Sequence, residues 1–153
     1  MPKIILRTII NAPRKIVFDL ARSIDFHKES TKNTQEKAIE GKTTGLIELH
    51  ESVTWRAKHF GFWLELESKI TEFDSQNYFV DEMQKGNFKS FRHEHIFKEN
   101  NGQTLMIDIF DYKSPFGILG KFADWLFLKK YMHAFLLKRN LLIKEHCEKR
   151  PSF

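Results

Sequence analysis

Alternation between apolar and polar residues through the middle of the chain is the feature that most constrains its fold. Val53, Trp55 and Ala57 share one face of a predicted strand, and the residues between them are polar or charged. A period of two puts successive side chains on opposite faces of a sheet. The pattern extends over residues 34–113, broken by turn signals such as Asn-Asn-Gly at 100–102. Together with a first strand over 3–10, it predicts an antiparallel sheet of about six to seven strands with one wet face.

Two short helices are expected directly after the first strand. Asn11 is a favoured helix cap, and Pro13 is tolerated in a first helical turn, where its missing N–H costs nothing. Apolar residues then follow at helical spacing, which predicts a helix over about 13–22. Residues 24–31 would form the second short helix.

The C-terminal part of the chain predicts one long helix. Residues 117–148 contain no proline and carry apolar side chains at helical spacing, so a helix of about 30 residues and about 45 Å is expected. Its first half is apolar nearly all round, and such a helix must be covered by other helices, a ligand or a partner. These elements give an α+β fold, and we expect one domain over residues 1–153.

Composition excludes several classes of protein. Cys147 is the single cysteine, so neither an intrachain disulfide nor a Cys-x-x-Cys metal site is available. The N-terminus lacks an apolar signal region, and no run approaches the ~18 apolar residues of a membrane span. We therefore expect a cytoplasmic protein. Lysine and arginine exceed aspartate and glutamate by five, but no recognition motif accompanies that excess, so no nucleic-acid partner is expected.

Three groups of segments resemble a known superfamily. Ile-Asn-Ala-Pro at 10–13, followed by apolar residues at 16–21, resembles the opening of the START-like superfamily. That superfamily includes birch-pollen-allergen-like proteins, lipid-transfer START domains and polyketide cyclase/dehydrase proteins. Residues 53–61 and several stretches within 79–117 are similar to a bacterial ligand-binding branch of it. The resemblance covers nearly the whole chain.

The resemblance implies a helix-grip fold, in which a curved antiparallel sheet wraps around the long C-terminal helix and leaves a cavity for an apolar small molecule. Fifteen phenylalanines among 153 residues fit such a cavity, although they would also fit an ordinary core. The expected lining residues share inward strand faces or lie on the last helix: Glu51, Trp55, Phe62, Leu66, Phe79, Phe91, His93, His95, Phe110, Tyr112, Phe122, Trp125 and Leu126.

Polar side chains are predicted on the same inward surface. His93, His95 and Asp108 would lie together with Glu51, and a histidine beside a carboxylate satisfies both groups when they are buried. We favour a buried network that fixes the sheet register, and the alternative is that such a pair is a candidate catalytic acid and base. His-x-His spacing also suits zinc, with Asp108 or Glu51 as third ligand. The pattern is loose, so we expect neither a metal nor a cofactor.

Asp81 and Glu82 are neighbours, so they lie on opposite faces of a strand and cannot both serve one site. One of them is expected to pair with Arg92 across the sheet.

Three functions remain open from the sequence. The first is binding or transport of a lipid-like or aromatic small molecule in the cavity, with no catalysis. The second is a cyclase or dehydratase that uses a His–Asp pair. The third is a membrane-surface or protein-interaction module, in which outward residues near Trp125 and Phe127, flanked by Lys129 and Lys130, contact a membrane or a second copy. We expect a monomer or a weak homodimer.

Overall fold

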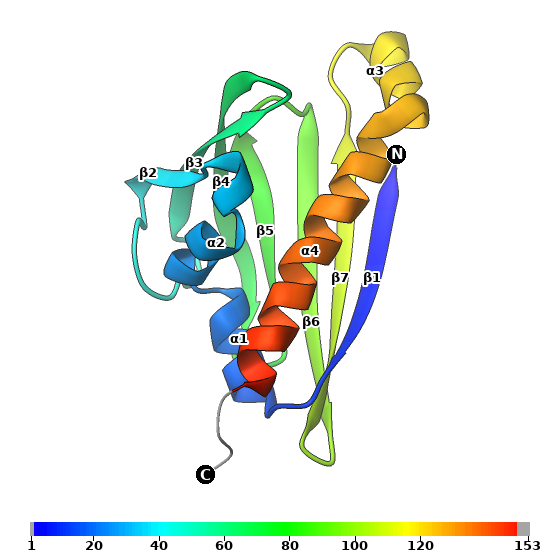
Figure 1. Cartoon of the computed structure of the whole chain (residues 1–153). Coiled ribbons are helices and arrows are strands. Elements are labelled where there is room, and N and C mark those ends of the chain that lie inside the picture. The colour runs from blue at the N-terminus through cyan, green and yellow to red at the C-terminus, as the bar shows by residue number, and fades with distance from the viewer. Residues whose placement is uncertain (1, 150–153) are drawn as a thin grey trace.

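The computed structural model describes residues 2–149, with the side chains of residues 124 and 125 outside that description. A seven-stranded antiparallel sheet forms its main layer (Figure 1). Its strands are β1 (Lys3–Ile10), β2 (Lys37–Gly41), β3 (Ser52–His59), β4 (Phe62–Asp74), β5 (Tyr78–Lys85), β6 (Ser90–Asn100) and β7 (Gln103–Lys113). The spatial order is β1-β7-β6-β5-β4-β3-β2, so the first and last strands pair. The predicted number of strands and their antiparallel arrangement are confirmed.

Short helices connect β1 to β2, as predicted. They are α1 (Arg14–Ala21), α2 (Ile24–Ser30) and the 3-10 turn η1 (Lys32–Thr34). Pro13 precedes the first residue of α1, and the hydroxyl oxygen of Ser23 caps α2 by accepting a hydrogen bond from the Phe26 amide at 3.1 Å. Val17 and Phe18 of α1 are fully buried, so this helix closes one end of the space beside the sheet.

The C-terminal helical stretch consists of α3 (Gly117–Ala123), a π-helical segment η2 (Asp124–Leu128) and α4 (Lys129–Glu148). The prediction of continuous helix over 117–148 is confirmed, but the wide turn of η2 changes the phase of the residues before it relative to those after it. In Figure 1, α4 runs across the concave side of the sheet, whereas α3 projects beyond the sheet edge. No helix among residues 2–149 combines the length and the apolar character needed to span a membrane.

The buried core is divided into two apolar clusters with polar side chains between them. One cluster contains Phe18 of α1, and the other contains Tyr112 of β7. We call the polar side chains between them the polar layer; its members are Asp81 of β5, His93 and His95 of β6, Asp108 of β7, and Arg139 and Asn140 of α4. Each strand or helix that crosses the layer is therefore apolar, then polar, then apolar again along its inward face.

Candidate functional site

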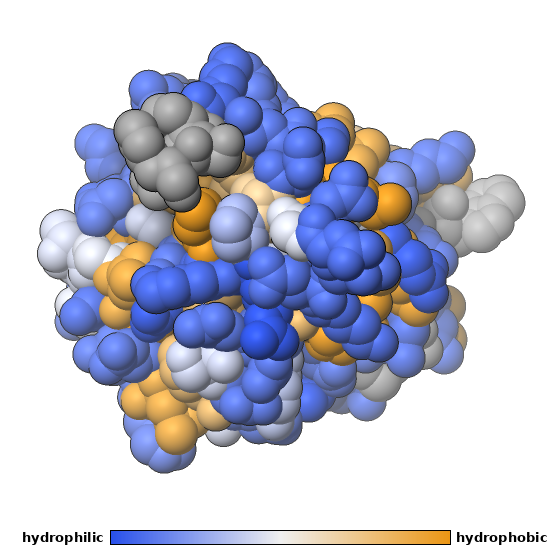
Figure 2. Space-filling model, turned by 90° about the horizontal axis from the view of Figure 1, so that it is seen from below, coloured by the Kyte–Doolittle hydropathy of each residue, from blue (hydrophilic) through white to orange (hydrophobic). Residues whose placement is uncertain are grey.

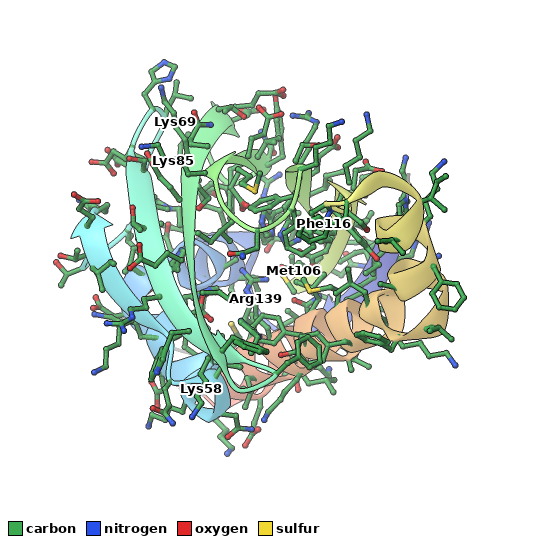
Figure 3. All side chains as sticks on the ribbon, turned by 90° about the horizontal axis from the view of Figure 1, so that it is seen from above. Lys58, Lys69, Lys85, Met106, Phe116 and Arg139 are labelled. Carbon is green, nitrogen blue, oxygen red and sulfur yellow. The ribbon has the colours of Figure 1, made fainter. Side chains whose placement is uncertain are left out.

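A cavity of about 150 Å³ lies between the concave face of the sheet and α4. The sheet lines it from β3 to β7, and the connection between α1 and α2 closes one side. From above, Figure 3 looks into this region, where Arg139 of α4 points toward the strands. Met132, Phe135 and Leu136 form the apolar helix wall. The cavity therefore combines mostly apolar walls with a few polar and charged side chains, as small-molecule sites do.

Many of the residues predicted to line a cavity do so. They are Trp55, Leu66, Phe79, Phe91, His93, His95 and Phe110. All lie on inward positions of β3 to β7, because the two-residue period of these strands is regular over the cavity. Tyr112 points to the same side but is fully buried in the apolar cluster at one end. Trp125 is the predicted lining residue whose side chain lies outside the described part.

Two predictions at strand ends were wrong. Glu51 precedes β3, so the alternation of the strand does not reach it, and its carboxylate accepts a hydrogen bond from the Glu48 amide at 2.8 Å. A lysine, Lys42, lies 3.7 Å from it. Phe62 falls on the inward face by the two-residue alternation of β4. It is, however, the first residue of that strand, beside the turn at Gly61, and 70% of it is exposed. Parity alone could not show that the cavity ends before Phe62.

Two predictions on the C-terminal helix were also wrong. Phe122 and Leu126 do not face the cavity, and about half of each side chain is exposed, 58% and 47% respectively. The reason is that α3 projects past the sheet and η2 changes the helical phase. The helix wall is formed instead by residues of α4, which begins one turn later.

Asp108 is the centre of the polar layer. Its Oδ1 lies 3.1 Å from Nε2 of His93 and 2.8 Å from Nδ1 of His95, and its Oδ2 accepts a 2.6 Å hydrogen bond from Asn140. Arg139 approaches Oδ1 to 3.8 Å and donates to the carbonyl oxygen of Ala21 at 3.0 Å. The predicted convergence of His93, His95 and Asp108 is thus found, with Asp108 fully buried behind the two histidines.

Asp81 is the site residue that the sequence analysis missed. Its Oδ2 lies 2.9 Å from Nε2 of His95, while Glu82 faces outward, 3.9 Å from Arg92. The expected pairing with Arg92 therefore involves Glu82, and Asp81 is free to face the cavity. Its signal was present in the pairing of strands, because β5 and β6 align Asp81 directly with His93. That alignment cannot be obtained from the parity of one strand.

The protonation of the layer follows from burial and neighbouring charge. Burial acts to raise the pKa of Asp108, but the hydrogen bonds from His93 and His95 outweigh it and hold that pKa well below its usual range. Burial acts to lower the pKa of His95, yet the carboxylates of Asp108 and Asp81 raise it overall. Burial and the neighbouring imidazole of His95 lower the pKa of His93. The pKa values of two adjacent imidazoles on one wall of the cavity are thus shifted in opposite directions, as in sites where one group serves as the acid and the other as the base.

A second polar pair, Glu36 and His27, also lines the cavity. Glu36 accepts a hydrogen bond from His27 at 3.0 Å, and the His27 ring packs on Trp55 with centroids 4.3 Å apart. Burial acts to raise the pKa of Glu36, but His27 lowers it overall. All three residues line the cavity, so a ligand there would meet this polar pair as well as the polar layer.

Comparison with known proteins bears on the fold. No protein-family model and no curated protein matches the sequence. Major latex-like protein 151 from Panax ginseng superposes with a TM-score of 0.70 at 17% identity, covering 95% of this chain and 97% of that chain. A protein from Thermus thermophilus gives 0.72 at 16%, covering 95% and 99%. The Aha1 dimer from Colwellia psychrerythraea gives 0.65 at 12%, covering 97% and 98%. The chain has the helix-grip fold.

The helix-grip fold explains why the polar layer forms. It lays the inward faces of β5, β6 and β7 against one long helix, so residues far apart in the sequence meet at one level of the cavity. Asp81, Asp108 and Asn140 are brought together in this way. The superpositions at identities below 20% show the fold alone, so the chemistry must be argued from the side chains of this chain.

Proposed function

We propose that the cavity binds a small, mainly apolar molecule that carries one polar or charged group. The observation behind this proposal is the mixed lining, with aromatic side chains on most walls and His93, His95 and Arg139 on one side. Apolar walls supply affinity, and a few placed polar groups set the orientation of the ligand. Such a protein would act as a carrier or a sensor.

The size of the cavity favours an aromatic ligand over a lipid. Typical small-molecule sites measure about 300–1,000 Å³, whereas this cavity has about 150 Å³. An apolar cavity of about that size holds one benzene-sized ring. A long acyl chain would need the helix to move away from the sheet, so a single-ring compound is the better fit.

Native mass spectrometry of the purified full chain tests this proposal. We expect a retained small molecule, or binding of a single-ring probe such as benzoate to the stripped protein, measured by calorimetry. Ser68 lines the cavity on β4, so Ser68→Leu should fill it and weaken binding at least about tenfold. Lys69 is its neighbour on the outer face of the sheet (Figure 3), so Lys69→Leu is the matched control. Equal binding by both variants would contradict a ligand in the cavity.

A catalytic alternative is favoured by one observation, the 3.1 Å contact between His93 and Asp108 beside the cavity. A neutral His93, oriented by Asp108, would act as general base toward a bound molecule, as in cyclase or dehydratase chemistry. His93→Gln should abolish conversion of the retained ligand, followed by its change in mass, while leaving binding intact. Conversion at the wild-type rate by this variant would exclude His93 as the base.

A membrane-surface alternative rests on the apolar end of the molecule. Phe116, Ile118 and Leu119 are 81%, 85% and 74% exposed on or beside α3, and Lys121 lies among them. Phe60, at the tip of the β3–β4 hairpin, extends this surface toward η2. The opposite end, seen in Figure 2, is mostly hydrophilic with separate apolar areas. Apolar side chains flanked by lysines suit an anionic lipid surface.

Vesicle sedimentation tests the membrane contact. Wild type should bind phosphatidylserine vesicles at low salt and lose them at high salt, and the double variant Ile118→Ser with Leu119→Ser should not bind. Both residues are exposed, so the variant should fold normally. Concentration-dependent mass in light scattering, abolished by the same variant, would instead indicate a weak homodimer. The cytoplasmic location stays a prediction from the sequence.

A further inference from the structure

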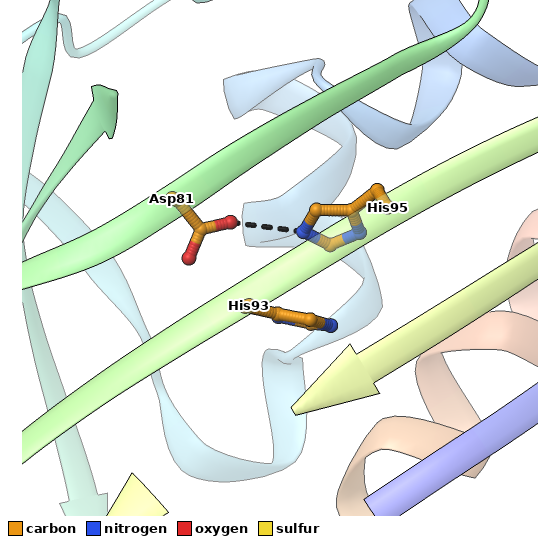
Figure 4. Close-up of side chains that lie close together, drawn as sticks. All are labelled: Asp81, His93 and His95. Carbon is orange, nitrogen blue, oxygen red and sulfur yellow. Dashed lines mark hydrogen bonds and ion pairs between the residues drawn. The ribbon is translucent and has the colours of Figure 1, made fainter. Parts of the chain in front are cut away.

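We propose that Asp81, His93 and His95 form a three-ligand site for a divalent transition metal of the zinc or iron(II) type. One carboxylate oxygen and one nitrogen from each imidazole lie within 4.8 Å of one another (Figure 4). The three side chains share the concave face because β5 and β6 pair Asp81 with His93, and His95 is two residues further along. The sequence pattern offers His93 and His95 as a pair, with Asp108 or Glu51 as the expected third ligand in place of Asp81.

Asp108 would contact the metal-binding histidines without binding the metal itself. It is hydrogen-bonded to Nε2 of His93 at 3.1 Å and lies 2.8 Å from Nδ1 of His95, so a single carboxylate contacts both rings. Metal-bound histidines usually donate their second N–H to such a group, which fixes the tautomer and raises the basicity of the ligating nitrogen. Asn140 in turn donates to Asp108 at 2.6 Å. These contacts of Asp108 add structural evidence for a metal site to the His-x-His spacing of the sequence.

One pair of ligand atoms is already close to the separation that a metal requires, and the others lie within 4.8 Å and would move closer. Nε2 of His95 and Oδ2 of Asp81 are 2.9 Å apart, and ligand atoms around a tetrahedral zinc are about 3.3 Å apart. The metal would replace the proton that these two atoms share. Once that proton has left, the layer contains two negative charges, on Asp81 and Asp108, and one positive charge, on Arg139. An added cation would therefore offset the remaining negative charge.

The remaining coordination positions face the cavity. All three ligands line it, and 19% of the Asp81 side chain is exposed. Among the described side chains, residues 2–123 and 126–149, no fourth histidine, cysteine or carboxylate joins the group. Three protein ligands with an open position are the arrangement of catalytic rather than structural zinc sites. Two nitrogens and one oxygen favour zinc, iron(II) or nickel over magnesium and calcium. The ion would thus bind the polar group of a molecule in the cavity.

The test is titration of the tag-free full chain with zinc and with cobalt(II), each without any organic ligand. We expect one ion per chain, a rise in melting temperature, and cobalt absorption bands of four- or five-coordinate nitrogen–oxygen ligation. X-ray absorption of the one-to-one zinc protein should show two imidazoles and no sulphur. Because this readout uses the wild-type protein, it does not depend on any variant folding. A shell with no imidazole, one imidazole or more than two would overturn the proposal.

Variants separate this site from surface histidines. Asp81→Asn and His93→Gln should weaken zinc binding at least about 100-fold, and Asp108→Asn about 10- to 100-fold. Glu82→Gln, on the outer face beside Asp81, and His50→Gln, in an exposed turn, should leave the affinity within about twofold. Equal loss in the control variants, or none in Asp81→Asn and His93→Gln, would refute the site. Since the probe is the metal alone, failure here leaves the proposed binding of an apolar molecule standing.

Discussion

Asp108 shows how one buried residue holds the site together. Its two oxygens contact His93, His95 and Asn140, and all of these side chains are buried. The sequence predicted the convergence of His93, His95 and Asp108 because each position follows from the parity of a long, regular strand. Parity could not supply Asp81, whose importance depends on which residue of the next strand lies opposite it.

Replacing Asp108 by asparagine should lower the free energy of unfolding by about 3 kcal/mol, because the buried carboxylate in contact with His93, His95 and Arg139 would be lost. Urea denaturation of the purified protein measures this. Asp111 is on the same strand but faces outward, 3.6 Å from a half-exposed lysine, so Asp111→Asn should cost less than about 1 kcal/mol. Similar losses in both variants would mean that the polar layer is not a stabilising centre.

Glu36 should make stability sensitive to acid. Its pKa is lowered in the folded protein, so its stabilising contribution is present above the unfolded value of about 4.5 and is lost as the pH falls through the folded value. Glu36→Gln should therefore show a shallower loss of stability between pH 5 and pH 3 in urea denaturation. The two proteins should converge at the lowest pH. A constant difference at every pH would contradict this assignment.

For each element, the sequence predicts whether it is a strand or a helix better than it predicts which way its residues face. Strands were recognisable from their period of two, and the long helix from its lack of proline and its apolar spacing. The π-helical η2 has no such signal, and it determines that α3 faces away from the sheet. Phe122 and Leu126 were therefore assigned to the right element but to the wrong side of it. Their exposure depends on helical phase, which composition does not encode.

Gly120 gives a test of how α3 is attached. Alanine favours helices over glycine by about 1 kcal/mol, but a Cβ at this position would collide with the carbonyl oxygen of Pro115. Gly120→Ala should therefore loosen α3 and raise hydrogen exchange there, while α4 remains protected. Lys121→Ala, an exposed change in the same helix, should not raise exchange. Slower exchange in Gly120→Ala would show that the collision is absent.

At the scale of the whole molecule, two apolar clusters are connected through one polar layer. Leu136 lies in one cluster and Ile143 in the other, on the same helix and on either side of Arg139 and Asn140. The resemblance in sequence already implied a sheet wrapped around this helix. It did not imply that the core would be divided, because that division arises only when β5, β6, β7 and α4 are aligned with one another.

Leu136→Ala and Ile143→Ala should each lower the stability by about 2–5 kcal/mol. Unfolding should remain a single transition, because α4 and the polar layer link the clusters. Circular dichroism and tryptophan fluorescence measured on the same samples would check this. Leu137→Ala, which is partly exposed, should cost much less. Transitions that separate between the two probes would show that the clusters unfold independently.

The cavity between α4 and the sheet has a consequence for the response of the protein to hydrostatic pressure. Unfolding eliminates internal voids, so the volume decreases and pressure favours the unfolded chain. A molecule that fills the space beside His93 and Arg139 removes that decrease in volume. Empty and occupied protein should therefore differ more in their resistance to pressure than in their resistance to heat, whatever the chemical identity of the occupant.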